Sequence, residues 1–189
     1  MPNFCVTMSY NTAMPNLPAF DADKAVEAIL YTTSRAKSGL YATLKLLYLA
    51  DKIHLERYGR FIFGDWYAAL PYGPVPSNSY DILKLVRNNT AQTLAPHAAK
   101  ALVVDSNHGI KALREPNLDE LSRSDVECLD RAIAEYSKCG FKELKRVTHD
   151  KAYDAAPRNG EIMMEAIASM LKNASELAQH VADPHPDRA

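Results

Sequence analysis

The chain has 189 residues, of which 47% are hydrophobic and 24% are charged, and its 22 basic and 23 acidic side chains give a formal net charge of -1. This length allows one well-packed core and argues against two ordinary domains. The balanced charge argues against strong, sequence-independent binding to nucleic acid, and no apolar run approaches the ~20 residues of a membrane-spanning helix. We therefore expect a globular, cytoplasmic protein.

The two ends of the chain differ from its middle. Residues 1–19 show no clear periodicity and contain no Lys or Arg, which argues against a secretory signal. We expect an N-terminal arm of unknown role over residues 1–19, one domain over residues 20–181 and a disordered tail over residues 182–189.

Two helices are predicted before residue 60. Asp21 can cap the first, whose apolar residues recur at helical spacing over residues 22–30. The second runs from about residue 40 to residue 58 and has apolar side chains on more than one face. Gly59 follows it, where a left-handed backbone costs little. This second helix is predicted to be the buried central helix of the domain.

The next stretch, DWYAALPYGPVPSNSYDIL at residues 65–83, holds the only tryptophan of the chain and three prolines. Each proline disfavours helix at the residue before it, so residues 70–76 should be extended and pre-ordered. Ser77 or Asn78 can cap the helix that follows. A stiff segment with aromatic side chains suits an interface, because little conformational freedom is lost on binding. The candidate partner-binding residues are Trp66, Tyr72, Pro74 and Val75.

A purely structural role for these aromatic residues is the alternative. They would then only pack the connector onto the central helix. We expect this role more strongly for Tyr67 and Tyr80 than for Trp66, since buried aromatic residues outnumber interface anchors.

One hairpin is predicted near residue 105, because ALVVD and IKALR flank the turn sequence SNHG. Together with the aromatic stretch after the central helix, it should give a small antiparallel sheet from residues near 60–70 and 101–114. Helices are also expected near residues 141–149 and 160–181. The predicted fold is mainly α: a single compact helical domain around a buried central helix, with a small antiparallel β element.

Two polar patterns mark predicted helix ends. Ser124-x-x-Glu127 can form a capping box that opens a helix to about residue 138. His149 and Asp150 should lie at a helix end, where a polar pair can cap the last carbonyl groups and a histidine suits the helix dipole.

No motif of a known chemistry is present: the chain has no GxSxG, Walker A, GxGxxG or HExxH sequence. Asp51 and His54 lie three residues apart, but nothing completes a metal site, and an ordinary surface pair is the preferred interpretation. Cys5, Cys128 and Cys139 show no CxxC spacing, and core packing is their expected use. We predict no enzyme activity, no metal site and no cofactor.

Residues 44–83 resemble the Panacea domain, the family of SocA-like antitoxins and phage-associated GepA-like proteins. The resemblance rests on four ordered segments, KLLYLA at 45–50, YGR at 58–60, GDWYAA at 64–69 and GPVPS at 73–77, followed by a helix with a tyrosine. Pro71 and Tyr72 depart from it by replacing a commonly basic or polar pair. The family-motif residues are Lys45, Tyr48, Asp51, Tyr58, Gly59, Asp65, Gly73, Pro74, Pro76 and Tyr80.

The resemblance implies a mostly helical domain that acts by binding. It implies an antitoxin that neutralises a toxin protein encoded nearby, either by direct contact or by delivering the toxin to a protease such as ClpXP. An interaction protein associated with a phage or a mobile element is an alternative.

Two other classes of function stay open at this point. A small enzyme would need a concave site, with Asp51, His54, Asp65 and Tyr72 as the residues to test. A nucleic-acid binder would need the six basic residues of 34–60 on one exposed face, and we expect nucleic acid to be an improbable partner. Acidic residues of 115–139 folded against that face would remove the second hypothesis.

Overall fold

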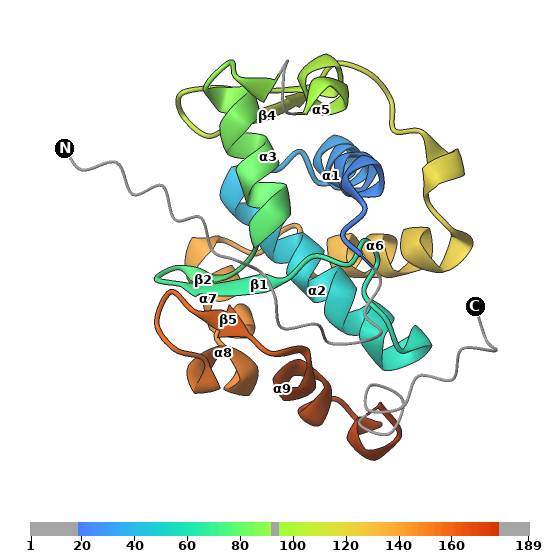
Figure 1. The fold of residues 1–189 in the computed structure, drawn as a ribbon, viewed down its shortest axis with the longest axis vertical. Helices are drawn as coiled ribbons and strands as arrows, with labels where there is room; N and C mark the ends of the chain where they lie inside the picture. The colour runs from blue at the N-terminus through green and yellow to red at the C-terminus, as the bar shows by residue number, and fades with distance from the viewer. Residues whose placement is uncertain (1–18, 92–94, 178–189) are drawn as a thin grey trace.

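The computed structural model describes residues 19–91 and 95–177, and over these residues the fold is mainly α with small antiparallel sheets, as predicted (Figure 1). The main helices are α1 (Ala22–Ala36), α2 (Leu40–Tyr58), α3 (Ser77–Arg87), α5 (Pro96–Ala101), α6 (Arg123–Tyr136), α7 (Phe141–Thr148), α8 (Lys151–Ala155) and α9 (Met164–Ser169). The strands are β1 (Tyr67–Leu70), β2 (Gly73–Pro76), β3 (Leu102–Val104), β4 (Ile110–Ala112) and β5 (Glu161–Ile162). Residues 1–18 of the expected arm, with Cys5, and the tail at 182–189 lie outside the described residues.

Helix α2 runs diagonally through the middle of the molecule and is the central helix that the sequence predicts (Figure 1). Helices α1, α6, α7 and α9 and strand β2 all pack against it. It ends at Gly59, whose φ is +73° and whose N–H donates to the Leu55 carbonyl at 3.0 Å. Helix α1 also begins as predicted, because the Asp21 side chain accepts the Lys24 N–H at 3.0 Å.

The apolar residues of α2 enter two separate cores. On one side Leu44 and Leu47 pack into a cluster with residues of α1, α3, α5 and α6. On the other side Tyr48 and Leu55 pack into a second cluster with residues of β1, β5 and α9. Apolar residues on more than one face of this helix are therefore explained by burial on two sides.

The strands of the described residues form two separate sheets. Strand β1 lies between β2 and β5 in one sheet, and β3 pairs with β4 in the other. A single sheet built from residues near 60–70 and 101–114 was therefore the wrong expectation. The hairpin around SNHG is confirmed, and the Asp105 carboxylate closes its turn by accepting the N–H groups of Asn107 and Gly109, both at 2.8 Å.

The capping box of α6 lies two residues earlier than predicted. The hydroxyl of Ser122 accepts the Asp125 N–H at 3.2 Å, and the Asp125 carboxylate accepts the Ser122 N–H at 2.9 Å. Ser124 cannot take this role because it is already the second residue of α6; its hydroxyl lies 3.3 Å from the His54 ring, and Glu127 is on the surface. The aspartate at the third helical position replaces the glutamate that the pattern suggested.

The C-terminal third confirms one predicted helix and corrects another. Helix α7 matches the expected helix near 141–149. The expected helix near 160–181 is correct only in part: Glu161–Ile162 pair with β1, α9 covers Met164–Ser169, residues 174–177 are helical again, and residues 178–181 lie outside the described residues. Residues that pair with a strand cannot be helical, and the local spacing of apolar residues does not show such long-range pairing.

The two described cysteines have structural positions. Cys128 is buried in the first core, where burial raises the pKa of its thiol to about 11. Cys139 is half-buried against the same core. This agrees with the expected use of both residues, and a thiol held protonated is a poor nucleophile.

Replacement of Leu47 by Ala should lower the free energy of unfolding by about 2–5 kcal/mol, because its fully buried side chain leaves a cavity beside α1 and α6. Leu118→Ala is the matched control: its side chain is 50% exposed, so the loss should stay within about 1 kcal/mol. Urea unfolding of both variants measures the two values. Equal losses would show that α2 is not the centre of the core.

Candidate functional site

The proline-rich connector is a hairpin rather than an extended lead-in. Strands β1 and β2 pair antiparallel with Leu70 opposite Gly73, so Pro71 and Tyr72 form the turn. Proline fixes a negative φ, which excludes the mirror-image turns that suit the twist of a two-residue hairpin. Gly73 supplies the missing left-handed residue, with φ at +103°. The prediction of an extended backbone over 70–76 is therefore correct for β2 and wrong for the turn at Pro71 and Tyr72.

The hairpin lies against a polar face of α2. Lys45, Tyr48 and Asp51 recur every three residues along the helix, and all three are buried. Lys45 is 1% exposed, and its Nζ donates to the Pro74 carbonyl of β2 at 2.7 Å. Burial lowers the pKa of this amine to about 7. The side chain thus links the central helix directly to the hairpin.

Asp51 makes the second link. Its carboxylate accepts the Tyr67 hydroxyl of β1 at 2.6 Å and the Ile62 N–H at 2.7 Å. Burial raises the pKa of this carboxyl to about 7, although both hydrogen bonds oppose that shift. Asp51 and His54 are therefore not a surface pair, since both side chains are fully buried.

His54 and Asp125 join α2 to α6. The Nδ1 of His54 donates to the Arg60 carbonyl at 2.8 Å, and Nε2 lies 3.1 Å from the Asp125 carboxylate. Lys24 approaches the same carboxylate to 2.7 Å. Burial alone would raise the pKa of the Asp125 carboxyl, but hydrogen bonds from His54, Lys24 and Ser122 lower it below its usual value.

Tyr48 and Asp150 join α2 to α8. The Tyr48 hydroxyl donates to Asp150 at 2.8 Å, and the Lys52 amine approaches the same oxygen to 2.7 Å. The other carboxylate oxygen accepts the N–H groups of Ala152 and Tyr153 and so caps the start of α8. The expectation that His149 and Asp150 cap the carbonyl end of a helix was wrong for Asp150, because a further helix begins there.

Asp65 caps α3 from a distance in sequence. Its buried carboxylate accepts the N–H groups of Asn78 and Ser79 at 3.0 and 2.8 Å and the Ser79 hydroxyl at 2.7 Å. Neither Ser77 nor Asn78 caps the helix as predicted, since α3 already begins at Ser77. A carboxylate at the N-terminus of a helix also suits the helix dipole.

An aromatic surface lies at the tip of the hairpin. Tyr72 is 62% exposed and Phe141 of α7 is 50% exposed, and their ring centroids are 5.8 Å apart. Tyr41 of α2 packs against Phe141 at 4.6 Å, and the Lys145 amine lies 5.9 Å from the Tyr72 ring. We call Tyr41, Tyr72, Phe141 and Lys145 the tip surface.

The four candidate partner-binding residues lie in three different places. Tyr72 belongs to the tip surface, whereas Trp66 lies half-buried at the opposite end of β1, about 15 Å away along the strand. Pro74 and Val75 belong to β2 and are buried, so they cannot make a large direct contact with a partner. Tyr67 is fully buried and Tyr80 half-buried, which fits the packing roles expected for them.

Sequence reasoning missed the residues that complete the tip surface. Phe141 and Lys145 follow the hairpin by about seventy residues and reach it only because α7 packs against β2 and α2. Helical spacing gave no signal for Phe141. It lies three residues before Leu144 and seven before Thr148, on the same stripe, so spacing alone predicts burial, whereas Phe141 is 50% exposed.

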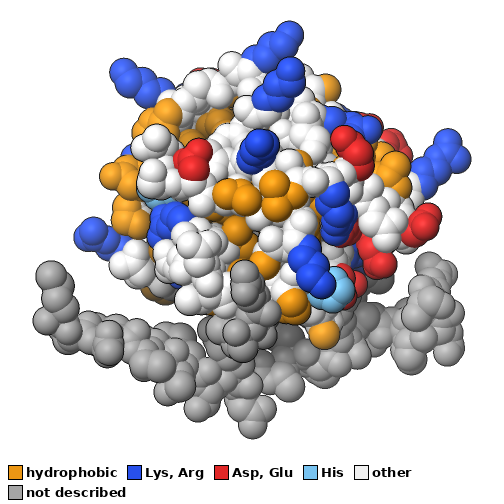
Figure 2. Space-filling view, turned by 90° about the horizontal axis from the view of Figure 1, so that it is seen from above, with side chains coloured by type: hydrophobic (Ala, Val, Ile, Leu, Met, Phe, Trp, Pro, Cys, Tyr) orange, Lys and Arg blue, Asp and Glu red, His pale blue; other side chains and the backbone are white. Residues whose placement is uncertain are grey.

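The basic residues of 34–60 do not form one exposed face. Arg35, Arg57 and Arg60 pair with Asp130, Glu127 and Asp125 of α6, and Lys45 is buried. The acidic segment at 115–139 therefore folds against the basic one. Figure 2 shows the end of the molecule that carries α5 and β4, where Lys and Arg side chains are spread apart with apolar side chains between them. Neither arrangement is the basic stripe that binds nucleic acid.

The residues considered for an enzyme site are not gathered in one concavity. Asp51 and His54 are fully buried, Asp65 is buried with its oxygens engaged at α3, and Tyr72 is on the surface. Within residues 19–91 and 95–177, no group of three or more His, Cys, Asp or Glu side chains is placed to hold a metal ion. In the same part of the chain, no helix combines the length and apolar character needed to cross a membrane.

Comparison with known proteins gives one match. The family model described as "Antitoxin SocA-like, Panacea domain" matches residues 44–153, which is 110 of the 189 residues. No curated protein and no solved structure matches the chain. The matched residues include the whole β1–β2 hairpin, α6, α7 and Asp150, and α2 from residue 44 onward.

Replacement of Gly73 by Ala should lower the free energy of unfolding by about 2 kcal/mol or more. A Cβ would be forced into a left-handed backbone and would lie 3.1 Å from both Lys45 Nζ and Thr148 Oγ1. Gly140→Ala is the control, since its φ is -73° and a Cβ there meets nothing within 4 Å, so the cost should stay within about 1 kcal/mol. Thermal or urea melts compare the two, and an unchanged Gly73 variant would contradict the packing described for the hairpin.

Lys45 should make stability depend on pH. Between pH 7 and its ordinary value of 10.5, the unfolded chain holds a proton on Lys45 that the folded protein has released, so the free energy of unfolding rises with pH. Lys45→Met should remove up to about 2 kcal/mol of the rise between pH 7 and pH 9. Exposed Lys111→Met is the control and should keep the wild-type slope. Parallel slopes for all three proteins in urea titrations would show that the Lys45 amine stays charged when buried.

Proposed function

Because the chain belongs to the family of SocA-like antitoxins, the Panacea domain family, we propose that it is an antitoxin that binds and neutralises a toxin protein encoded nearby. Family membership carries this proposal. The same membership favours a role in binding over catalysis, which agrees with the buried and fully engaged carboxylates of Asp51 and Asp65.

We propose the tip surface as the main contact with the toxin. Tyr72 and Phe141 expose large aromatic rings side by side, and aromatic residues of this kind dominate the binding energy of protein interfaces. Pro71 and the bond from Lys45 to the Pro74 carbonyl hold the turn in place. Little conformational entropy is therefore lost when a partner binds there.

The charge around the tip surface indicates what the partner presents. Lys138, Lys142 and Lys145 surround Phe141 in sequence, and among the described residues none of them forms an ion pair with a carboxylate. Glu143, the acidic residue of this segment, is already paired with Arg146 at 2.6 Å. A toxin surface with an apolar centre and an acidic rim would complement this arrangement.

Neutralisation by direct contact is the mechanism that we propose, in the cytoplasm. Exposed rings on a rigid turn support a stable complex. Delivery of the bound toxin to a protease such as ClpXP would start from the same complex and would differ in the fate of the toxin. An interaction protein associated with a phage or a mobile element would use the same surface with another partner.

Tyr72→Ala and Phe141→Ala should each weaken toxin binding by about 10-fold to 100-fold, the loss typical of an aromatic hot spot. Both side chains are largely exposed, so the free energy of unfolding should change by less than about 1 kcal/mol. The measurement is growth rescue on co-expression with the product of the neighbouring gene, combined with calorimetric titration of the purified pair.

Leu113→Ala is the control for this experiment. The Leu113 side chain is 51% exposed, and the residue directly follows β4, away from the β1–β2 hairpin. It should protect cells fully. Full protection by both aromatic variants would place the toxin elsewhere, and failure of the wild-type chain to rescue growth would contradict the antitoxin assignment. A toxin that disappears from cells only when a protease is present would favour delivery over direct neutralisation.

A further inference from the structure

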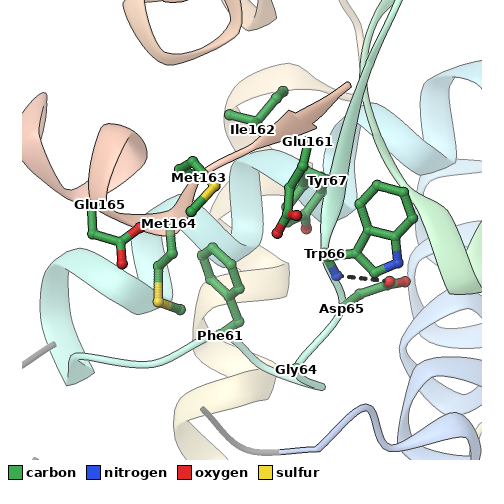
Figure 3. Close-up of a pocket in the computed structure, with 10 residues that line it drawn as sticks. All are labelled: Phe61, Gly64, Asp65, Trp66, Tyr67, Glu161, Ile162, Met163, Met164 and Glu165. Carbon is green, nitrogen blue, oxygen red and sulfur yellow. Dashed lines mark hydrogen bonds between the residues drawn. The ribbon is translucent and has the colours of Figure 1, made fainter. Parts of the chain in front are cut away.

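A small cavity lies at the end of the hairpin opposite the tip surface. It has a volume of about 80 Å³ and is formed where the segment before β1 faces β5 and the start of α9. Figure 3 shows Phe61, Met163 and Met164 grouped on one side of it and the indole of Trp66 on the other, with the Glu161 carboxylate between them. The cavity therefore combines residues that are about one hundred positions apart in the sequence.

The lining selects an apolar occupant. Two methionines, a phenylalanine and an indole surround the cavity, and Met163 is 47% exposed at its mouth. A volume of this size is several times the space that one water molecule requires, but apolar walls offer water few hydrogen bonds. One aliphatic side chain the size of leucine or methionine would fill it, and the flexible methionines would adapt to its shape.

The rim of the cavity is acidic. Glu161 and Glu165 are both exposed, and neither forms an ion pair within the part of the chain that the structure describes. The third carboxylate of the lining, Asp65, is buried and engaged with the start of α3. Two uncompensated negative charges beside an apolar cavity favour an occupant with basic residues next to its apolar side chain.

The neighbouring strand indicates the shape of the occupant. Strand β5 lies at the edge of its sheet, with β1 on one side. An edge strand leaves backbone N–H and C=O groups available, and extended peptides commonly align with such an edge.

We propose that this cavity is a second docking site, which takes one aliphatic side chain from an extended basic segment of a protein partner. The site lies about 15 Å from the tip surface along β1, and it shares no residue with the proposed toxin contact. The acidic rim of this site is opposite in charge to the basic surroundings of the tip surface. The two ends of one hairpin therefore select partners of opposite charge.

The chain itself supplies the probe for this proposal, because its only tryptophan lines the cavity. The full-length protein is titrated with the peptide acetyl-GKKLKKG-amide, and the emission of Trp66 is followed together with its quenching by acrylamide. We expect a saturable blue shift and reduced quenching. The peptide with alanine in place of leucine should bind at least about 10-fold more weakly, and the peptide with glutamate in place of lysine should not bind.

Variants of the protein test the rim. Glu161→Lys combined with Glu165→Lys should weaken binding of the basic peptide at least about 10-fold and create binding of the glutamate peptide. Glu115→Lys combined with Glu120→Lys makes the same change of net charge at another exposed place and should bind like the wild type. Tyr72→Ala should also bind normally, which separates this site from the proposed toxin contact. Melting temperatures close to that of the wild type establish that all variants are folded.

Three results would overturn the proposal. The first is absence of saturable binding up to about 1 mM peptide. The second is equal affinity for the leucine and alanine peptides, which would mean that charge alone attracts them. The third is full protection of Trp66 from acrylamide in the free protein, which would mean that the chain covers its own cavity.

Discussion

A helix buried on two sides needs partners for the polar side chains that it buries, and α2 buries five: Thr43, which bonds to the nearby Ser38, and four that bond to other parts of the domain. An unpaired amine, hydroxyl, carboxylate or imidazole in such a place would cost several kcal/mol. Lys45, Tyr48, Asp51 and His54 are satisfied respectively by the Pro74 carbonyl, by Asp150, by Tyr67 with the Ile62 N–H, and by the Arg60 carbonyl with Asp125. Lys45 and Asp51 fix the β1–β2 hairpin, Tyr48 fixes the start of α8, and His54 fixes the start of α6. The arrangement of the whole domain thus depends on the polar face of its central helix.

This constraint separates the residues that build the scaffold from those of the exposed tip surface. Most family-motif residues are buried: Lys45, Tyr48 and Asp51 on the helix, and Asp65, Gly73, Pro74 and Pro76 in and beside the hairpin. The exposed turn is different, because Pro71 and Tyr72 stand where the resemblance leads one to expect a basic or polar pair. Under the proposed function, the buried motif residues would form the support and the turn would supply the contact with the partner. A rigid support would let Tyr72 serve as an anchor at little cost in conformational entropy.

The sequence predicted the helical class, the central helix and its end at Gly59, because these follow from local spacing and from one backbone conformation. It did not predict the hairpin turn. Pro71 and Pro74 favour an extended backbone at the residues before them whether or not the chain reverses at Tyr72. Nor did it predict that Asp65 caps α3 or that Phe141 joins Tyr72, because both contacts are made across long sequence separations. The motif left the roles of its residues open, and the structure shows that most of them are buried.

Hydrogen exchange of the chain, alone and bound to the product of the neighbouring gene, tests the central claim most directly. Amide protection on binding reports which backbone segments a partner covers. We expect added protection at the turn of 70–73 and over the first turn of α7, with α5 and the hairpin of β3 and β4 unchanged. Protection confined to α5 and that second hairpin, with the turn and α7 unaffected, would contradict the claim that a rigid polar core presents the tip surface to the toxin.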